Sequence, residues 1–568
     1  MKILNYLVFV LIFVIAAFFY HFVFQNAVNV PYFDDFAYLE YVIKLQDTPN
    51  VWAFLRELEY KHNGHGVITA KLVFWLQALW TGEVNFRTLI VVGSGLVLLL
   101  FGYFVQILRV NRLPLYLSLP VALLLFTPAY HENIFWAAAL WQYTASFVIG
   151  ILSYYLLIQS SRWSFVAAIV AGFMLTYTNG NGLFGMYVGA LIPFLQGRYF
   201  KTLLWVLACL ATTFVFYWYY PFGFGSLGQE RNLQHSATTL VAFLGACAHY
   251  LRGQKTEVVL LGGGVALALI GVILVLGVSY IKAILSNKKP THWLQKLLNT
   301  PENLSLLALA AWLTITGTGV AVARASASLD TPTRYMIYSI MAFLTLYILI
   351  LTALPAFWQR FTAGISTIFG VVIWVGTYLF AGPEVINFRN SLVADAYSLR
   401  HHGRVSGKLE TMTNTHAQRY FSEALKRGIY RLPPDVAPPI FLTTADTTKR
   451  LSLPLQVDLD TLTAYGGILI HKIRNATLPL DESSAANAHF LVLKKDSTAY
   501  LTAVRQTPNH NRKTFLGSFK YFRDGFEAYI YQENIPTGRY QIGILTLQNG
   551  QKQVTFTPET IQIRDFRR

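Results

Sequence analysis

Charge is scarce in this chain. Asp, Glu, Lys and Arg make up 13% of its 568 residues, whereas about 25% is usual in soluble proteins. Hydrophobic residues make up 54%, and the mean hydropathy is +0.43. This composition excludes an ordinary soluble domain and predicts a mainly helical, polytopic membrane protein.

Acidic residues are scarcer than basic ones: 28 Asp and Glu stand against 45 Lys and Arg, for a net charge of +17. A basic excess is compatible with nucleic-acid binding. Here, however, Lys and Arg lie in short connections between apolar runs and in the C-terminal third, as the positive-inside rule and anionic lipids produce. We therefore predict membrane lipids as partners and no nucleic acid.

Cysteine is nearly absent. Cys209 lies within an apolar run and Cys247 in a polar loop, so we expect no disulfide framework and no cysteine metal cluster.

A small-residue cleavage site is also missing after the apolar segment from Ile3 to Phe24. This segment is longer than the hydrophobic region of a signal peptide. We expect that segment to remain as a membrane anchor.

Long hydrophobic runs, in contrast, are abundant. Basic residues occur in alternate connections between them, which are almost free of acids, so these connections are expected to face the cytoplasm. An odd number of spans then places the first loop and the C-terminal region outside, in the periplasm of a bacterial inner membrane. The eleven runs long enough to span cover residues 3–24, 88–108, 113–130, 142–160, 163–179, 182–196, 201–221, 257–281, 303–323, 335–356 and 361–382.

Strongly ionisable side chains are missing from the middle of these runs, and His21 lies near the outer end of the first. Ion-coupled transporters place such groups near the membrane midplane. The candidate polar groups gather in the outward loops instead, which favours a reaction chamber at the outer face over a transport path.

The chain divides into three predicted parts: a transmembrane domain at 1–383, with a first outer loop at 25–87; a helical connector at 384–434; and an antiparallel β-sandwich at 435–568. In the outer loop, Thr48 and Pro49 predict a helix start near Asn50, and an amphipathic helix covers 68–79. Turn signals in the last part are Gly466-Gly467, Asp524-Gly525, Pro536-Thr537-Gly538 and Asn549-Gly550.

The first candidate site is Asp34-Asp35, within the aromatic-rich stretch from Val30 to Phe36. A carboxylate beside apolar surface has raised basicity and can take the proton of an acceptor hydroxyl. The alternative is that both acids cap the following helix, whose dipole favours negative charge at its start.

The second candidate site is Glu59-Tyr60-Lys61-His62-Asn63-Gly64-His65-Gly66. Two histidines with a nearby glutamate could bind a metal, although a fixed third ligand is missing. Glycine-rich backbone with Lys61 and His65 could instead hold a phosphate, or the segment is a plain loop.

The third candidate site combines aromatic rings with amides and an acid, in Tyr130 to Trp136 and in Trp141-Gln142-Tyr143. Sugar rings bind such surfaces by stacking and by hydroxyl hydrogen bonds. An interfacial aromatic belt explains the Trp and Tyr residues equally well, but it does not explain His131, Glu132 and Asn133.

The fourth candidate site is the pair Arg324 and Arg334, followed by Tyr335, in an outward connection that runs against the positive-inside bias. Guanidinium groups bind phosphate through two parallel hydrogen bonds. The alternative is that the two arginines form a surface pair that contacts lipid headgroups.

The four candidate sites together place acids, an amide-aromatic patch and two arginines on one face of the membrane. This set of groups suits a reaction on a lipid-linked phosphosugar.

Together these segments resemble the GT-C superfamily of polyprenyl-phosphate-dependent glycosyltransferases, which includes protein O-mannosyltransferases, aminoarabinose transferases of lipid A and mycobacterial arabinosyltransferases. The resemblance covers about residues 1–383. It rests on the acidic pair Asp34-Asp35, the His62–His65 loop, the stretch from Glu132 to Gln142 and the pair Arg324 and Arg334-Tyr335.

The resemblance implies sugar transfer from a polyprenyl-phosphate donor to a glycan, lipid or protein acceptor. One of Asp34 and Asp35 would be the base. Donor phosphate would bind Arg324, Arg334, Tyr335, His65 and Lys61; sugar or acceptor would bind His131, Glu132, Asn133, Trp136 and Gln142. Because the carrier phosphate is a good leaving group, no cofactor is required. A divalent metal, as oligosaccharyltransferases use, is an alternative, but their acid-x-acid motif has no clear match here.

Two other classes stay open. A polyprenyl-linked glycan ligase or a lipid flippase would use the arginines without needing the acidic pair. A non-enzymatic, glycan-binding assembly protein would use the β domain, but eleven spans are far more than an anchor requires.

Overall fold

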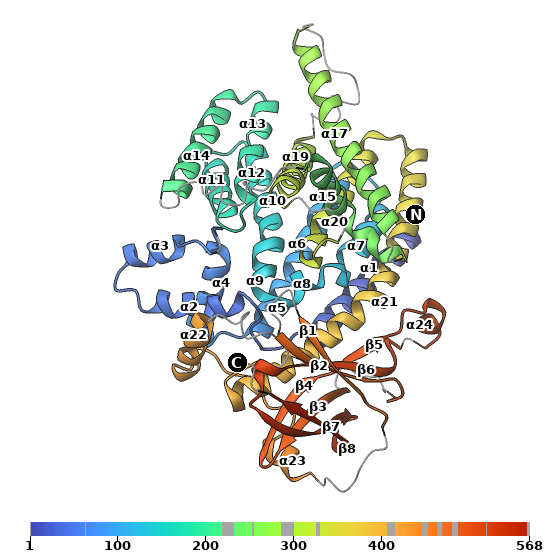
Figure 1. The fold of residues 1–568 in the computed structure, drawn as a ribbon. Coiled ribbons are helices and arrows are strands. Elements are labelled where there is room, and N and C mark those ends of the chain that lie inside the picture. The colour runs from blue at the N-terminus through green and yellow to red at the C-terminus, as the bar shows by residue number, and fades with distance from the viewer. Residues whose placement is uncertain are drawn as a thin grey trace. The chain divides into compact units, whose positions relative to one another are not determined.

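The computed structural model describes residues 2–62, 64–218, 232–252, 255–285, 300–324, 330–405, 415–445, 453–462, 468–479, 487–518 and 520–564. The chain forms two compact units, whose elements are drawn in Figure 1. The first comprises residues 1–21, 44–76 and 91–377, and the second comprises residues 22–43, 77–90 and 378–568. Five helices contribute residues to both units: α1 (Lys2–Asn26), α2 (Asp35–Gln46), α4 (Ile68–Thr81), α5 (Phe86–Gly93) and α21 (Ala356–His402).

The described part of the first unit is helical. Its remaining helices are α3 (Val51–Glu59), α6 (Gly95–Val110), η1 (Leu115–Ser118), α7 (Leu119–Leu125), η2 (Pro128–Tyr130), α8 (His131–Phe135), α9 (Ala137–Ala139), η3 (Leu140–Thr144), α10 (Ala145–Ile158), α11 (Arg162–Thr176), α12 (Gly182–Val188), α13 (Leu191–Leu195), α14 (Tyr199–Trp218), α15 (Leu233–Gly245), η4 (Ala246–Ala248), α16 (His249–Arg252), α17 (Lys255–Leu285), α19 (Pro301–Ala323), η5 (Thr333–Tyr335) and α20 (Met336–Ala353).

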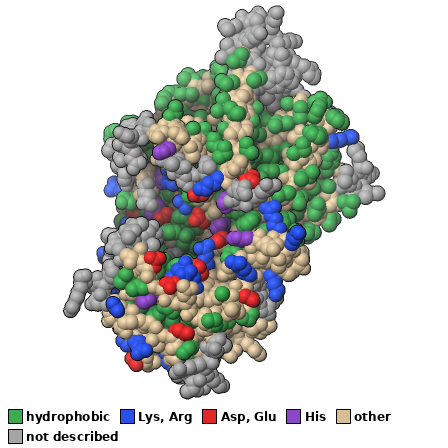
Figure 2. All heavy atoms as spheres, turned by 45° about the vertical axis from the view of Figure 1, so that its right-hand side comes forward, with side chains coloured by type: hydrophobic (Ala, Val, Ile, Leu, Met, Phe, Trp, Pro, Cys, Tyr) green, Lys and Arg blue, Asp and Glu red, His purple; other side chains and the backbone are tan. Residues whose placement is uncertain are grey.

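Eight helices among the described residues are long and apolar enough to cross a membrane, so the prediction of a multi-pass membrane protein is confirmed. In Figure 2 the surface of the long helices is largely hydrophobic, whereas the surface over the C-terminal strands is mostly polar and charged. The eight are Asn5–Asn26, Phe86–Val110, Ala137–Ile158, Tyr199–Trp218, Lys255–Val275, Pro301–Ala323, Thr333–Ala353 and Ala356–His402.

Three of the eleven predicted runs form shorter helices. Pro114, Pro120 and Pro128 divide the run at 113–130 into η1, α7 and η2, because proline lacks the N–H that continues a helix. The run at 163–179 gives the 15-residue α11, and the run at 182–196 is split into α12 and α13.

Trp312 is one of the largest fully buried side chains of the first unit. Its side chain is fully buried on α19, and its Nε1 donates to the carbonyl of Asn181 at 3.0 Å. Gly150 on α10 and Gly185 on α12 leave room for the indole, since a Cβ at either position would lie within 3 Å of it. Three helices far apart in the sequence therefore pack around one ring.

The second unit contains two four-stranded antiparallel sheets, which confirms an antiparallel β region at the C-terminus. One has the order β1-β2-β6-β5 and the other β4-β3-β7-β8; side chains from both form one apolar core that includes Ile473, Leu493, Ile530 and Ile542. The strands are β1 (Gln456–Leu462), β2 (Ile468–Asn475), β3 (Ala488–Lys495), β4 (Thr498–Ala503), β5 (Arg505–Pro508), β6 (Phe522–Tyr531), β7 (Gly538–Gln548) and β8 (Gln551–Ile563), and the short helices are α22 (Thr415–Lys426), α23 (Pro439–Thr444), α24 (Arg512–Ser518) and η8 (Gln532–Asn534).

One predicted turn is present in the structure, and another predicted turn is replaced by a bulge. Asn549-Gly550 joins β7 to β8 with positive φ at both residues, as a type I′ hairpin requires. Asp524-Gly525, by contrast, does not separate strands: it lies inside β6, where Gly525 has a φ of 94° and the pairing with β5 changes register. A bulge there replaces the expected turn. Gly466-Gly467 lies outside the described residues.

The helix expected near Asn50 begins where predicted, but its cap differs. Asn50 itself accepts the Ala53 N–H at 2.9 Å and caps α3, whereas the Thr48 hydroxyl bonds back to the Leu45 carbonyl. The predicted amphipathic helix at 68–79 is α4.

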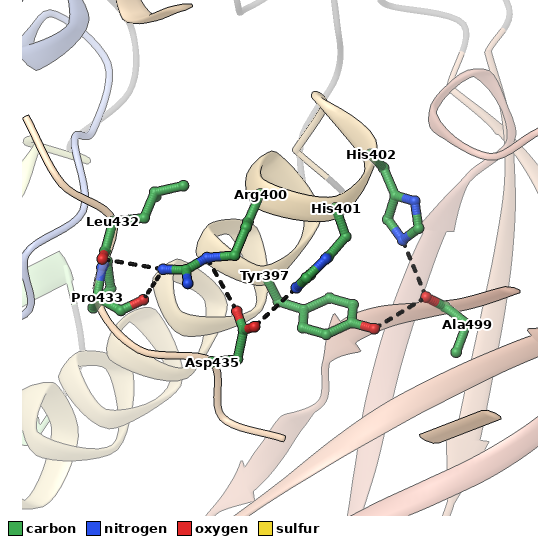
Figure 3. A network of polar contacts seen from close by, with 8 residues as sticks. All are labelled: Tyr397, Arg400, His401, His402, Leu432, Pro433, Asp435 and Ala499. Carbon is green, nitrogen blue, oxygen red and sulfur yellow. Dashed lines mark hydrogen bonds and ion pairs between the residues drawn. The ribbon is translucent and has the colours of Figure 1, made fainter. Parts of the chain in front are cut away.

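A polar network ties the end of α21 to the C-terminal region within the second unit (Figure 3). Asp435 accepts from His401 at 2.9 Å and lies 3.3 Å from Arg400 Nε. Arg400 also donates to the carbonyls of Leu432 and Pro433, and His402 bonds to the carbonyl of Ala499 on β4 at 3.0 Å. The helix end is thereby fixed to strand β4 and to the segment before α23.

We expect Asp435→Asn to destabilise the folded chain by about 1–3 kcal/mol, because Arg400 and His401 lose a shared carboxylate partner that is only 18% exposed. Thermal unfolding of the full-length protein in detergent measures this. Asp330→Asn is the matched control, since Asp330 is 73% exposed in its pair with Lys255 and such pairs contribute little. Equal shifts for the two variants would contradict the assignment.

Burial lowers the pKa of His489 on β3 to about 4. The unfolded chain binds a proton at the ordinary value of about 6.5, so between these values the unfolded state holds a proton that the folded state lacks. Stability from this group is therefore complete above pH ~6.5 and falls by about 3 kcal/mol as the pH approaches 4. We expect His489→Gln to flatten the acid-induced loss of melting temperature between pH 7 and 5; an unchanged slope would show that another group causes it.

Candidate functional site

The acidic pair lies at the start of α2, in the second unit. Phe33 turns the chain with a φ of 45°, and the carbonyl of Asp34 accepts the N–H groups of Ala37 and Tyr38. The carboxylate of Asp35 accepts the Tyr32 N–H at 3.0 Å and is 1% exposed, whereas Asp34 is half-buried. Asp35 thus closes the turn that precedes α2, and Asp34 is the more accessible acid.

Aromatic contacts hold this acidic turn. Tyr32 meets Phe388 of α21 edge-on at 4.7 Å, and Phe36 meets Phe421 of α22 at 5.5 Å. The pKa of Tyr430 is raised mainly by burial, with a further contribution from the nearby negative charge of Asp35. The turn therefore has a rigid setting within the second unit.

Glu132 and Arg334, from the third and fourth predicted sites, meet in the first unit although 202 positions separate them. Glu132 Oε2 accepts from the Arg334 backbone N–H at 3.2 Å and from its Nη1 at 3.4 Å. Asn133 is fully buried; its amide donates to the Arg334 carbonyl at 3.4 Å and accepts from Thr144 at 2.9 Å. Helix α8 thus positions η5 and the guanidinium of Arg334.

Both predicted arginines lie close to the ring of Tyr335. Arg324, exposed at the end of α19, is 5.4 Å from the ring centroid, and Arg334 is 5.1 Å from it. Arg334 also lies 5.9 Å from the Trp136 ring. Cation–π contacts of this kind orient guanidinium groups without neutralising them. Residues 325–329 between the arginines lie outside the described part of the chain.

Gln142 and Tyr143 belong to η3, a single π-helical turn. Such turns often occur at functional sites, because the extra residue widens the helix and redirects its side chains. Tyr143 meets Tyr335 edge-on at 5.5 Å, which connects η3 to the arginine pair. Gln142, His131 and Trp136 are half-buried.

The loop Asn179-Gly180-Asn181 contacts both the cluster of tyrosines around Tyr335 and His65. The sequence patterns did not identify this loop as part of the site. Asn181 Nδ2 donates to the Tyr338 hydroxyl at 3.1 Å, and Tyr338 neighbours Tyr335. A Cβ at Gly180 would lie 2.5 Å from His65 Nδ1, so the imidazole packs directly on the glycine. The available signal was a cluster of amides and glycines between two apolar runs.

Lys61 caps a helix. It is 7% exposed, and its Nζ donates to the Phe216 carbonyl near the end of α14 at 2.6 Å. Burial lowers the pKa of Lys61, while the charge of Glu59 opposes that shift.

His62 and His65 form a tight turn by exchanging backbone hydrogen bonds of 2.9 Å. Asn63 between them is outside the described residues. No cluster of three or more His, Cys, Asp or Glu suited to a metal occurs in the described ranges.

Comparisons with protein-family models, with characterised proteins and with solved structures return no match for this chain.

Lys71 is a fully buried lysine that fixes the predicted second site. Its Nζ donates to the carbonyls of Glu57 at 2.7 Å and Tyr60 at 2.6 Å, at the end of α3. We expect Lys71→Met to destabilise the protein by about 1.5–3 kcal/mol, because it leaves carbonyls at the end of α3 without this charged donor. Thermal unfolding measures the change, and Lys494→Met on the half-buried end of β3 is the control. A Lys71 variant as stable as that control would refute the capping role.

Proposed function

We propose that this chain is an integral membrane glycosyltransferase. It moves a sugar from a polyprenyl-phosphate donor to a glycan, lipid or protein acceptor at the outer face of a bacterial inner membrane. We propose that the chain is a GT-C-like enzyme that crosses the membrane eleven times, if the three shorter apolar segments are counted as crossings. In this proposed orientation the N-terminus is cytoplasmic and the C-terminal β-sandwich is periplasmic. The alternation of basic connections supports that orientation.

The observation that carries the proposal is that Arg324 and Arg334 lie 5.4 and 5.1 Å from the same ring, that of Tyr335. Two always-charged, geometrically fixed donors suit a phosphate that gains negative charge as the sugar leaves. Glu132 bonds to Nη1 of Arg334 and holds the guanidinium beside the Tyr335 ring. Tyr335, Trp136 and Gln142 supply the aromatic and amide surface that a sugar ring needs.

Asp34 is the proposed base, since Asp35 is used to close its turn. The carboxylate takes the acceptor proton as the acceptor oxygen bonds to the anomeric carbon. The bond from that carbon to the carrier phosphate oxygen breaks, and its electron pair leaves with the phosphate. Charge stabilisation by guanidinium groups substitutes for a metal, so no cofactor is invoked. His65 and His131 are assigned to the donor and acceptor sides, and Lys61 to structure.

Transfer from a panel of polyprenyl-phosphate sugars to acceptors in a membrane extract, with protein in nanodiscs, tests the proposal. We expect Asp34→Asn to lower the rate at least ~100-fold, because general-base catalysis contributes about that much. Arg324→Ala and Arg334→Ala should both reduce transfer, and EDTA should leave it intact. Asp496→Asn, in an exposed β3–β4 turn with a φ of 51° that Asn tolerates, is the control.

Full transfer by Asp34→Asn and Asp35→Asn would refute the base assignment. If the arginine variants alone lost activity, a ligase or flippase acting on the same lipid carrier would replace the proposal. Absence of transfer with every donor, together with retained glycan binding, would favour a non-enzymatic assembly protein.

A further inference from the structure

The second unit contains a groove, lined by both charged and apolar residues, that the proposed transfer reaction does not use. It has a volume of about 730 Å³ and lies where β2 ends and β6 begins. Its wall includes Gln456, Arg474, Asn475, Thr507, Arg523, Asp524 and Glu527. This size falls within the ~300–1,000 Å³ typical of small-molecule sites.

The groove is shaped by main-chain constraints. Asn475 is buried: its oxygen accepts the N–H groups of Thr477 and Leu478, and its amide donates to the Pro454 carbonyl. A Cβ at Gly525 would lie 2.5 Å from the Asn475 carbonyl oxygen, so glycine is needed for the β6 bulge to approach β2. These constraints fix the backbone at the end of β2 and at the β6 bulge, where the groove lies.

The wall carries both donors and acceptors, and two of its charged residues, Arg474 and Glu527, have defined bonding partners. On the outward face of the sheet, Arg474 pairs in register with Glu527; Arg474 also bonds to Asp458, and Glu527 bonds to Lys472 and Tyr529. These bonds orient the charged groups. The Nε of Arg474 is buried without a hydrogen-bond partner among the described residues.

The charges of the wall cancel: Arg474 and Arg523 oppose Asp524 and Glu527. An anionic ligand would meet two carboxylates and a cationic ligand two guanidinium groups, so neither suits the site. A neutral hydroxyl, by contrast, both donates and accepts, and a chain of hydroxyls satisfies both kinds of wall residue. We infer that this groove binds a neutral oligosaccharide, independently of catalysis.

The experiment measures binding of neutral glucan, mannan and arabinan oligosaccharides, with oligogalacturonate as the anionic comparison, to the full-length chain in nanodiscs. At least one neutral oligosaccharide should bind, and oligogalacturonate should bind at least ~10-fold more weakly. Arg523→Gln and Asp524→Asn should each weaken neutral binding about 10-fold, as the loss of a hydrogen bond to a charged group implies.

Arg539→Gln on β7 is the matched control, because Arg539 bonds to Thr560 on β8 and does not line the groove. It should bind as the unaltered chain does, and so should Asp34→Asn, which separates this inference from the transfer proposal. Absence of neutral binding, tighter anionic binding, or equal binding by the groove and control variants with unchanged melting temperatures would overturn the inference.

Discussion

A chain with so little charge depends on satisfying its buried polar groups internally. In a bilayer no water replaces a missing partner, so an unmet backbone or side-chain group is costly. Lys71 donates to carbonyls at the end of α3, and Asn133 joins η5 to the π-helical turn. Trp312 uses its single N–H on the Asn181 carbonyl. These bonds allow the loops between long apolar helices to be ordered.

The same internal bonds explain the arrangement of the candidate site in the first unit. Short helices α8 and η5 are too brief to be stable alone, and they are held by Glu132 and Asn133 against Arg334. Tyr335 then receives two guanidinium groups, one from each side of the connection. Each member of the group has a defined contact, and such preorganisation is what the proposed stabilisation of a phosphate would require.

The second unit satisfies its charged groups in a different way. Its strands carry most of their charge on outward faces, where water and neighbouring charges satisfy it, while both sheets share an apolar core. The acidic turn belongs to this unit and is held by rings from α21 and α22. Burial of Asp35 beneath the turn assigns the two adjacent acids different roles, although their positions in the sequence are equivalent.

Much of the architecture followed from local patterns. Hydrophobic runs predicted the eight long helices, because helix length and apolarity are read directly from consecutive residues. Asn549-Gly550 predicted its hairpin because few residues adopt positive φ. Local patterns gave the wrong prediction where pairing with another segment of the chain determined the local structure. Asp524-Gly525 has the composition of a turn but bulges within β6, since β5 pairs with β6 on both sides of it, at Phe526 and at Phe522.

The sequence by itself determined the membrane character, the helical and β-rich parts and the kinds of residue available for chemistry, because composition and periodicity are local properties. Only the tertiary structure decided that Glu132 meets Arg334, that two arginines share Tyr335 and that Lys61 and Lys71 cap helices. It also revealed the Asn179–Asn181 loop and the neutral groove. These features join residues far apart in the chain, and their contacts depend on packing that no single segment encodes.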